Sequence, residues 1–143
     1  MKKIILYCLF CVSVFCFQSR LLAGELKIST DNLEYKRVYF AGGCFWCMEE
    51  SFDKISGVIK SISGYSGGHL KNPKYEDVIY KDTGHVEAIE ITYDPKKISY
   101  NDLLNVFWKN IDPFDRYGQF CDKGKSYRSV TFFQNKIQKK IIM

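Results

Sequence analysis

Residues 37–55 read RVYFAGGCFWCMEESFDKI and join two different patterns through a pair of glycines. Before the glycines, residues 37–41 are apolar and rich in β-favouring side chains, which predicts a buried strand. After them, apolar residues recur every three or four positions with acidic residues between, which predicts a helix from Cys44 to Ile55. A strand that passes through a glycine turn into a helix is typical of the start of a β-α-β unit.

Alternating patterns of the same two kinds continue along the chain. We expect strands over 58–65, 86–93 and 128–133, a short helix over 73–80, a helix that includes 103–108, and a last helix from Gln134. Ser99 and Asp102 form a capping-box pattern before the helix that includes 103–108. Residues 112–126 have no apolar period, which at this length indicates a functional or disordered loop. The order β-α-β-β-α-β predicts an α+β fold of the ferredoxin-like, split βαβ type, with helices packed on a mixed sheet.

The N-terminal part of the 143-residue chain predicts a signal peptide over residues 1–24. Two lysines precede the run 4–17, whose single polar residue is Ser13, and small residues follow at positions 23 and 24. Fourteen apolar residues fall short of the roughly 20 that span a membrane. We therefore expect secretion or a periplasmic location, with an uncleaved anchor as the alternative. Residues 25–35 would be a lead-in segment and residues 36–143 one globular domain.

Removing this leader changes the charge and the number of cysteines. The formal charge falls from +5 to +2 because Lys2, Lys3 and Arg20 are lost, and the remaining basic residues form no stripe suited to nucleic acid. Three of the six cysteines also lie in the leader. The cysteines that remain are Cys44, Cys47 and Cys121. An odd number in an oxidising compartment indicates a possible reactive thiol.

Cys44 lies where the predicted strand passes into the predicted helix. The unpaired N–H groups and the positive end of the helix dipole favour a thiolate at that position. A buried structural cysteine is the alternative, but a site after Gly42-Gly43 at a helix start suits that role poorly. The sequence therefore favours Cys44 as a nucleophile.

Cys44 and Cys47 also form a C-x-x-C motif, for which three interpretations compete. A zinc site needs a second ligand pair, whereas Cys121, His69 and His85 stand alone in the sequence, so no metal is expected. A thioredoxin-like redox pair is possible, although the chain lacks the long parallel-sheet pattern of such proteins. In the third interpretation Cys44 is the nucleophile and Cys47 a helper or bystander.

Three further residues have both a functional and a structural interpretation. Trp46 lies off the apolar stripe of the helix, so it suits the wall of a substrate pocket, while Phe45 lies on the stripe and suits the core equally well. Alternation in residues 86–93 places Glu87 on the apolar face, where desolvation would raise its pKa and prepare it as a general acid. The alternative is an exposed glutamate at the frayed start of the strand.

Several motifs occur in a fixed order over residues 38–133. They are Gly43-Cys44-Phe45-Trp46, Gly64-Tyr65, Asn72-Pro73-x-Tyr75, Thr83-Gly84-His85-Val86-Glu87, Tyr93-Asp94-Pro95, Phe107-Trp108 with Asp112-Pro113, Gly118-Gln119-Phe120-Cys121-Asp122 and Tyr127-Arg128-Ser129. In this order they resemble the peptide methionine sulfoxide reductases of the A type.

The resemblance implies thiol-dependent reduction of methionine S-sulfoxide in oxidised proteins, peptides or the free amino acid. Cys44 would attack the sulfoxide sulfur and Glu87 would protonate its oxygen. The residues implied to hold the substrate are Phe45, Trp46, Tyr75, Asp122 and Tyr127. The cysteine sulfenic acid formed would become a disulfide, which a dithiol such as thioredoxin reduces, without another cofactor. We expect a monomer.

The sequence departs from the resemblance at two places. Many relatives extend past position 143 and often carry a resolving cysteine there, so we expect the C-terminal part of the domain to be incomplete. The position of Cys47 is commonly glycine in the family, which leaves both Cys47 and Cys121 as candidate resolving cysteines. A C-x-x-C disulfide oxidoreductase and an inactive truncated chain are the alternative functions.

Overall fold

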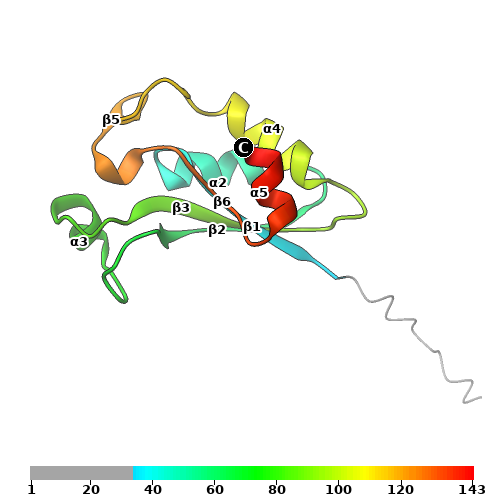
Figure 1. Ribbon diagram of the computed structural model, residues 1–143, viewed down its shortest axis with the longest axis horizontal. Coiled ribbons are helices and arrows are strands. Elements are labelled where there is room, and N and C mark those ends of the chain that lie inside the picture. The colour runs from blue at the N-terminus through cyan, green and yellow to red at the C-terminus, as the bar shows by residue number, and fades with distance from the viewer. Residues whose placement is uncertain (1–33) are drawn as a thin grey trace, which may run out of the picture. The chain divides into compact units, whose positions relative to one another are not determined.

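The strands that form the larger sheet follow one another along the chain in the order, and close to the positions, that the sequence predicted (Figure 1). The computed structural model describes residues 34–143, so the expected signal peptide and nearly all of the lead-in segment lie outside the described residues. Within that part of the chain, the strands of the larger sheet are β1 (Lys36–Ala41), β2 (Val58–Ser66), β3 (Val86–Tyr93) and β6 (Val130–Phe132). Their order is β2-β3-β1-β6. This order is that of the ferredoxin-like arrangement and confirms the α+β prediction.

The strands of the larger sheet differ in direction, and each pairs with neighbours that run the opposite way. Both β1 and β2 pair antiparallel with β3, so they run in the same direction but are separated by it. The strand β6 pairs antiparallel with β1 on its other side. Every neighbouring pair in the larger sheet of the described chain is therefore antiparallel, because a split βαβ unit inserts a strand between its two parallel ones.

The helices confirm the predicted positions to within a few residues. They are α2 (Phe45–Asp53), α3 (Tyr75–Tyr80), α4 (Tyr100–Lys109) and α5 (Lys136–Ile142), with the 3₁₀ turn η1 (Lys125–Tyr127). The capping box exists as expected, since the Asp102 N–H donates to Ser99 Oγ at 3.1 Å and the Ser99 N–H donates to Asp102 Oδ2 at 3.1 Å. Such a cap contributes about 1 kcal/mol to helix stability. No helix among residues 34–143 is long and apolar enough to cross a membrane.

One difference concerns residues 112–126, which were expected to be a loop without regular structure. They contain a small hairpin of β4 (Gly118–Gln119) and β5 (Asp122–Lys123), followed by η1. The two strands of this hairpin are only two residues long, so they leave no alternating pattern in the sequence. The hairpin nevertheless fixes the position of the residues at its turn.

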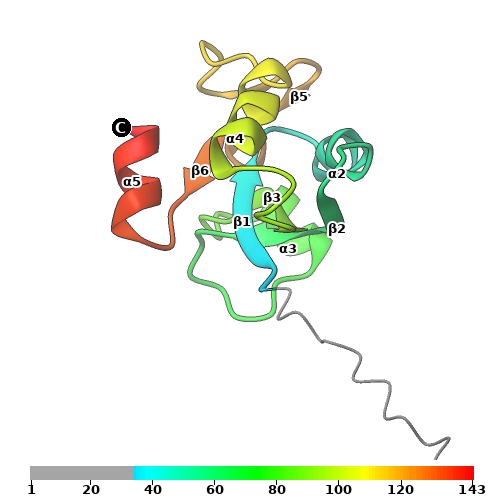
Figure 2. The ribbon, with the colours of Figure 1, turned by 90° about the vertical axis from the view of Figure 1, so that its right-hand side faces the viewer.

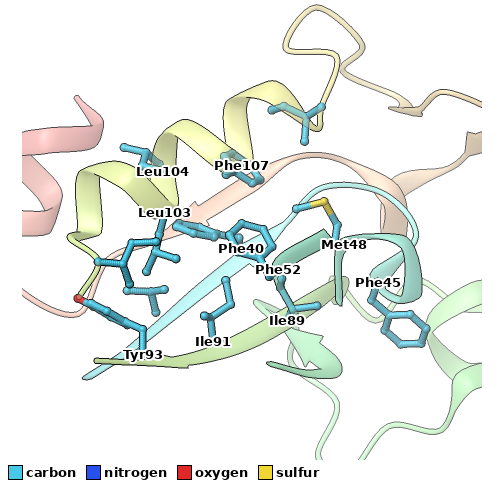
Figure 3. Packing of buried hydrophobic residues seen from close by; sticks show 13 residues of the cluster. Phe40, Phe45, Met48, Phe52, Ile89, Ile91, Tyr93, Leu103, Leu104 and Phe107 are labelled. Carbon is cyan, nitrogen blue, oxygen red and sulfur yellow. The ribbon is translucent and has the colours of Figure 1, made fainter. Parts of the chain in front are cut away.

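Helices α2 and α4 cover the same face of the sheet (Figures 1 and 2). Their buried side chains meet those of β1 and β3 in one core (Figure 3). The rings of Phe40 and Phe107 stack with centroids 4.9 Å apart, and Phe52 lies 5.9 Å from Phe40. Each buried side chain of this size stabilises the fold by roughly 1.5–3 kcal/mol. This core holds the start of α2 against the sheet, where the site lies.

Candidate active site

Cys44 is the N-cap residue of α2, as the sequence predicted. Its carbonyl oxygen accepts a hydrogen bond from the Met48 N–H at 3.1 Å, so the helix begins at this residue. The preceding Gly43 has φ +88°, and a Cβ atom there would lie 2.6 Å from the Cβ of Gln119. Only glycine combines this left-handed conformation with so close an approach. The turn therefore holds the thiol at the helix N-terminus and packs the later hairpin directly against it.

Glu87 lies on the core face of β3 and is 2% exposed, which excludes the frayed, exposed alternative. Its Oε2 accepts a hydrogen bond from the Phe45 N–H at 3.0 Å, so the carboxyl is tied to the residue after Cys44. Its Oε1 is buried without a hydrogen-bond partner in the described chain. Burial raises the pKa of Glu87, the Phe45 N–H opposes that shift, and the charge of Asp122 adds to it. A protonated carboxyl with one free oxygen can donate a proton to a ligand.

Phe45 and Trp46 have different environments, although they are neighbours in sequence. Phe45 is 6% exposed and packs against the rings of Tyr65 and Trp46, with centroids 5.7 and 5.4 Å away. Trp46 is 66% exposed, in agreement with its position off the helical stripe. Phe45 is thus part of both the core and the wall beside Cys44.

Tyr75, Tyr127 and Asp122 come from three separate elements, of which Tyr127 and Asp122 interact with the Glu87 carboxyl and Tyr75 with Tyr127. Burial, the charges of Glu87 and Asp122, and the neighbouring Tyr75 hydroxyl raise the pKa of Tyr127 above its ordinary value. The phenol therefore stays protonated and can act as a hydrogen-bond donor. Phe45, Asp122 and Tyr127 thus lie around Cys44 and Glu87, Trp46 contacts the ring of Phe45, and Tyr75 lies beside Tyr127.

The three cysteines of the described chain share a hollow of about 410 Å³, which we call the thiol hollow. Its walls are Gly42, Cys44, Cys47, Met48, Ser51, Lys109, Asn110, Gln119, Phe120, Cys121 and Asp122. All three thiols are free. A hydrogen bond with Cys44 and burial raise the pKa of Cys47, and the charges of Asp122 and Glu50 act in the same direction. Cys44 therefore precedes the residue whose N–H binds Glu87 and shares the thiol hollow with two further thiols.

Residues that the sequence did not single out support this arrangement. Gln119 is 1% exposed, and its side-chain amide accepts from the Asp112 N–H at 2.7 Å and donates to the Asp112 carbonyl at 2.8 Å. Phe120 has φ +50°, a left-handed conformation that costs a non-glycine residue roughly 1–2 kcal/mol. Both belong to a motif that carried the family resemblance, but nothing in their spacing indicated a contact with Gly43.

No group of three or more histidine, cysteine and acidic side chains within residues 34–143 is arranged to hold a metal ion.

The sequence profile of the family described as peptide methionine sulfoxide reductase matches residues 36–143. The chain belongs to this family.

Curated relatives and solved structures agree with this assignment. The peptide methionine sulfoxide reductases MsrA of Streptococcus uberis and Streptococcus agalactiae are 51% and 50% identical to this chain over 106 residues. These alignments cover 74% of the chain and 63% of each relative, so the chain spans less than two thirds of their length.

Two solved structures have the same fold. Methionine sulfoxide reductase A of Corynebacterium diphtheriae matches with a TM-score of 0.68 and 30% identity, covering 71% of this chain and 48% of that one. Mxr1 from Saccharomyces cerevisiae in reduced form matches with a TM-score of 0.71 and 29% identity, covering 76% and 64%.

Proposed function

We propose that this protein reduces methionine S-sulfoxide in peptides and proteins to methionine, with Cys44 as nucleophile. The observation that carries the proposal is the carboxyl of Glu87, which is buried, tied to the N–H next to Cys44, and left with one unpaired oxygen. A buried polar atom without a partner is costly unless a ligand completes it. A sulfoxide oxygen above Cys44 would accept the proton that this carboxyl carries.

The first step joins the sulfur of Cys44 to the substrate. The Cys44 thiolate attacks the sulfoxide sulfur, which forms a sulfur–sulfur bond, while Glu87 transfers its proton to the sulfoxide oxygen. The S–O bond of the substrate and the new sulfur–sulfur bond then break as the hydroxyl is transferred to the sulfur of Cys44. Methionine leaves with two more electrons, and Cys44, which has lost two, becomes a sulfenic acid.

The surrounding side chains suit the two ends of a sulfoxide. The hydroxyls of Tyr127, near the Glu87 carboxyl, and of its neighbour Tyr75 would donate hydrogen bonds to the oxygen as its charge grows. Burial raises the pKa of Glu87, and the negative charge of Asp122 adds to that shift. Phe45 and Trp46 would receive the S-methyl group on the apolar side of Cys44.

Recycling would use the thiol hollow. A second thiol condenses with the Cys44 sulfenic acid, which forms a disulfide and releases its oxygen as water. Cys47, hydrogen-bonded to Cys44, and Cys121, on the hairpin turn, are both candidates for this role. Two thiols of an external dithiol, such as a thioredoxin-like protein, would then reduce the disulfide and become oxidised themselves, with no other cofactor.

The leader sequence supports a related proposal about location. We propose that residues 1–24 direct the protein to the periplasm or the exterior. Expression in a bacterial host with a C-terminal tag, followed by N-terminal sequencing, tests this directly. A mature chain that begins near Glu25 in the extracytoplasmic fraction is expected, whereas an intact Met1 in a membrane fraction would indicate a retained anchor.

The catalytic proposal is tested with a methionine S-sulfoxide peptide and dithiothreitol. Wild-type protein is expected to release methionine, and Cys44→Ser to release none. Cys47→Ser, Cys121→Ser and the double variant identify the resolving thiol, because a sulfenic-acid probe should label Cys44 only when that thiol is absent. Turnover that persists in Cys44→Ser would show that another group is the nucleophile.

A further inference from the structure

Phe120 occupies a position where glycine is the favoured residue. It is the first residue of the two-residue turn between β4 and β5, and its φ of +50° lies in the left-handed region. Hairpin turns with a positive φ at this position favour glycine because a Cβ atom is strained there. A phenylalanine at such a site needs a reason beyond the turn itself.

The core does not supply that reason, because Phe120 is 65% exposed. The neighbouring contacts instead hold the strained residue in place. Gln119 is buried and hydrogen-bonded to the backbone at Asp112, and it pairs with Asp122 across the hairpin. The same Gln119 packs against Gly43, so the turn is fixed relative to the start of α2. The aromatic ring is thus presented to solvent from a rigid support.

The location of Phe120 relates it to the reacting sulfur. Phe120 and Cys44 line the same thiol hollow. The sulfoxide group itself would lie against Phe45 and Glu87. A polypeptide that carries this group must continue past Cys44, and Phe120 is the exposed aromatic side chain that it would meet in the hollow. At about 410 Å³, the hollow is in the range of roughly 300–1,000 Å³ that is typical of ligand pockets.

We propose that Phe120 binds an apolar side chain next to the methionine sulfoxide in a peptide substrate. This inference rests on the proposed function and adds a preference for apolar sequence context. The lining of the hollow favours the substrate over the reductant as the partner of Phe120. Asp122, which the family resemblance places among the substrate-binding residues, lines the thiol hollow together with Phe120 and Cys44.

The test compares two blocked peptides, Leu-Met(O)-Leu and Gly-Met(O)-Gly, both with the S-sulfoxide. Their binding to Cys44→Ser is measured by calorimetry, because this variant binds without reacting. We expect the leucine peptide to bind roughly 5- to 10-fold more tightly than the glycine peptide. Adding Phe120→Gly should remove this preference without lowering the melting temperature, since glycine relieves the positive φ.

Matched variants separate binding from structure. Phe120→Tyr keeps the ring and should keep the preference for leucine. Phe114→Gly removes an equally large side chain that is 93% exposed and lies outside the hollow, and it should also leave the preference intact. If Phe120→Gly does not fold, Phe120→Asn takes its place, because asparagine also tolerates a positive φ.

Three results would overturn the inference. They are an unchanged leucine preference in the Phe120 variants, a preference lost equally in Phe114→Gly, and a raised KM for the dithiol with peptide binding intact. The last would identify Phe120 as part of a reductant-binding surface. Because binding to Cys44→Ser requires no turnover, a wild-type protein that failed to reduce either peptide would refute the proposed function while leaving this comparison valid.

Discussion

Glu87 and Glu90 lie three residues apart on β3 and point to opposite faces of the sheet. Glu90 accepts a hydrogen bond from Tyr39 Oη at 2.8 Å and lies 3.9 Å from Arg37 Nε, with part of its side chain in solvent. Glu87 is buried, and a single backbone N–H is its hydrogen-bond partner within residues 34–143. One carboxyl therefore has solvent, a phenol and a guanidinium around it, whereas burial raises the pKa of the other. The difference arises from the alternation of a strand, which assigns the two residues to different surroundings.

Replacing each glutamate by glutamine tests this contrast most strongly. Glu87→Gln should lower kcat/KM for a methionine S-sulfoxide peptide by about 10²- to 10⁴-fold, because glutamine cannot transfer a proton. Glu90→Gln should lower it less than about twofold. Both are measured as methionine release in the presence of dithiothreitol.

The pH dependence of the same reaction identifies the acid. As pH rises through the raised pKa of Glu87, the proton is lost and wild-type activity should fall. Glu90→Gln should retain this decline, and the residual activity of Glu87→Gln should lack it. Equal losses in the two variants would show that burial of Glu87 has no catalytic consequence.

Asp122→Asn should change the pH dependence that Glu87 gives to the activity, by less than Glu87→Gln does. The negative charge of Asp122 raises the pKa of Glu87, so its removal should lower that pKa and move the alkaline decline of activity to lower pH. The pKa of Tyr127 should fall in the same variant. A pH profile of kcat/KM gives the position of the decline independently of any loss in its height. A decline that stayed in place would mean that Asp122 acts by contact with the substrate alone.

Tyr39→Phe is expected to have the smallest effect, and only on stability. The hydroxyl of Tyr39 donates to Glu90, and its loss should lower the free energy of unfolding by about 1 kcal/mol. Urea denaturation measures this difference, and turnover should be unchanged because Tyr39 lies on the face away from Cys44. Reduced turnover would indicate that the two faces of β3 are coupled.

The sequence predicted those parts of the site that lie on long, regular elements. The apolar alternation of β3 identified the face of Glu87, and the glycine pair with the helical period of α2 identified the position of Cys44. The structure confirms both positions. The motif order then supplied Tyr75, Asp122 and Tyr127 by resemblance, which local patterns did not identify.

Other features depend on contacts that no local pattern encodes. The contact between Gln119 and Gly43 joins a two-residue strand to a turn far away in the chain, so it left no periodic signal. Tyr65 contacts Phe45 because the register of β2 sets it opposite Glu87. The strain at Phe120 likewise follows from the hairpin geometry rather than from residue type.

The pairing of β1 with β3 also determines which changes of chain length the site can accept. Phe40 is opposite Ile89, and the hydrogen bond from Phe45 to Glu87 spans 42 positions of sequence. Extra residues in the exposed segment 70–72 leave that pairing intact. One extra residue between Glu87 and Ile89 would rotate the carboxyl to the opposite face. Over evolutionary time, exposed loops such as 70–72 are therefore free to lengthen. In β3, by contrast, the number of positions from Glu87 to the core residue Ile89 must stay even, so that both side chains point to the same face.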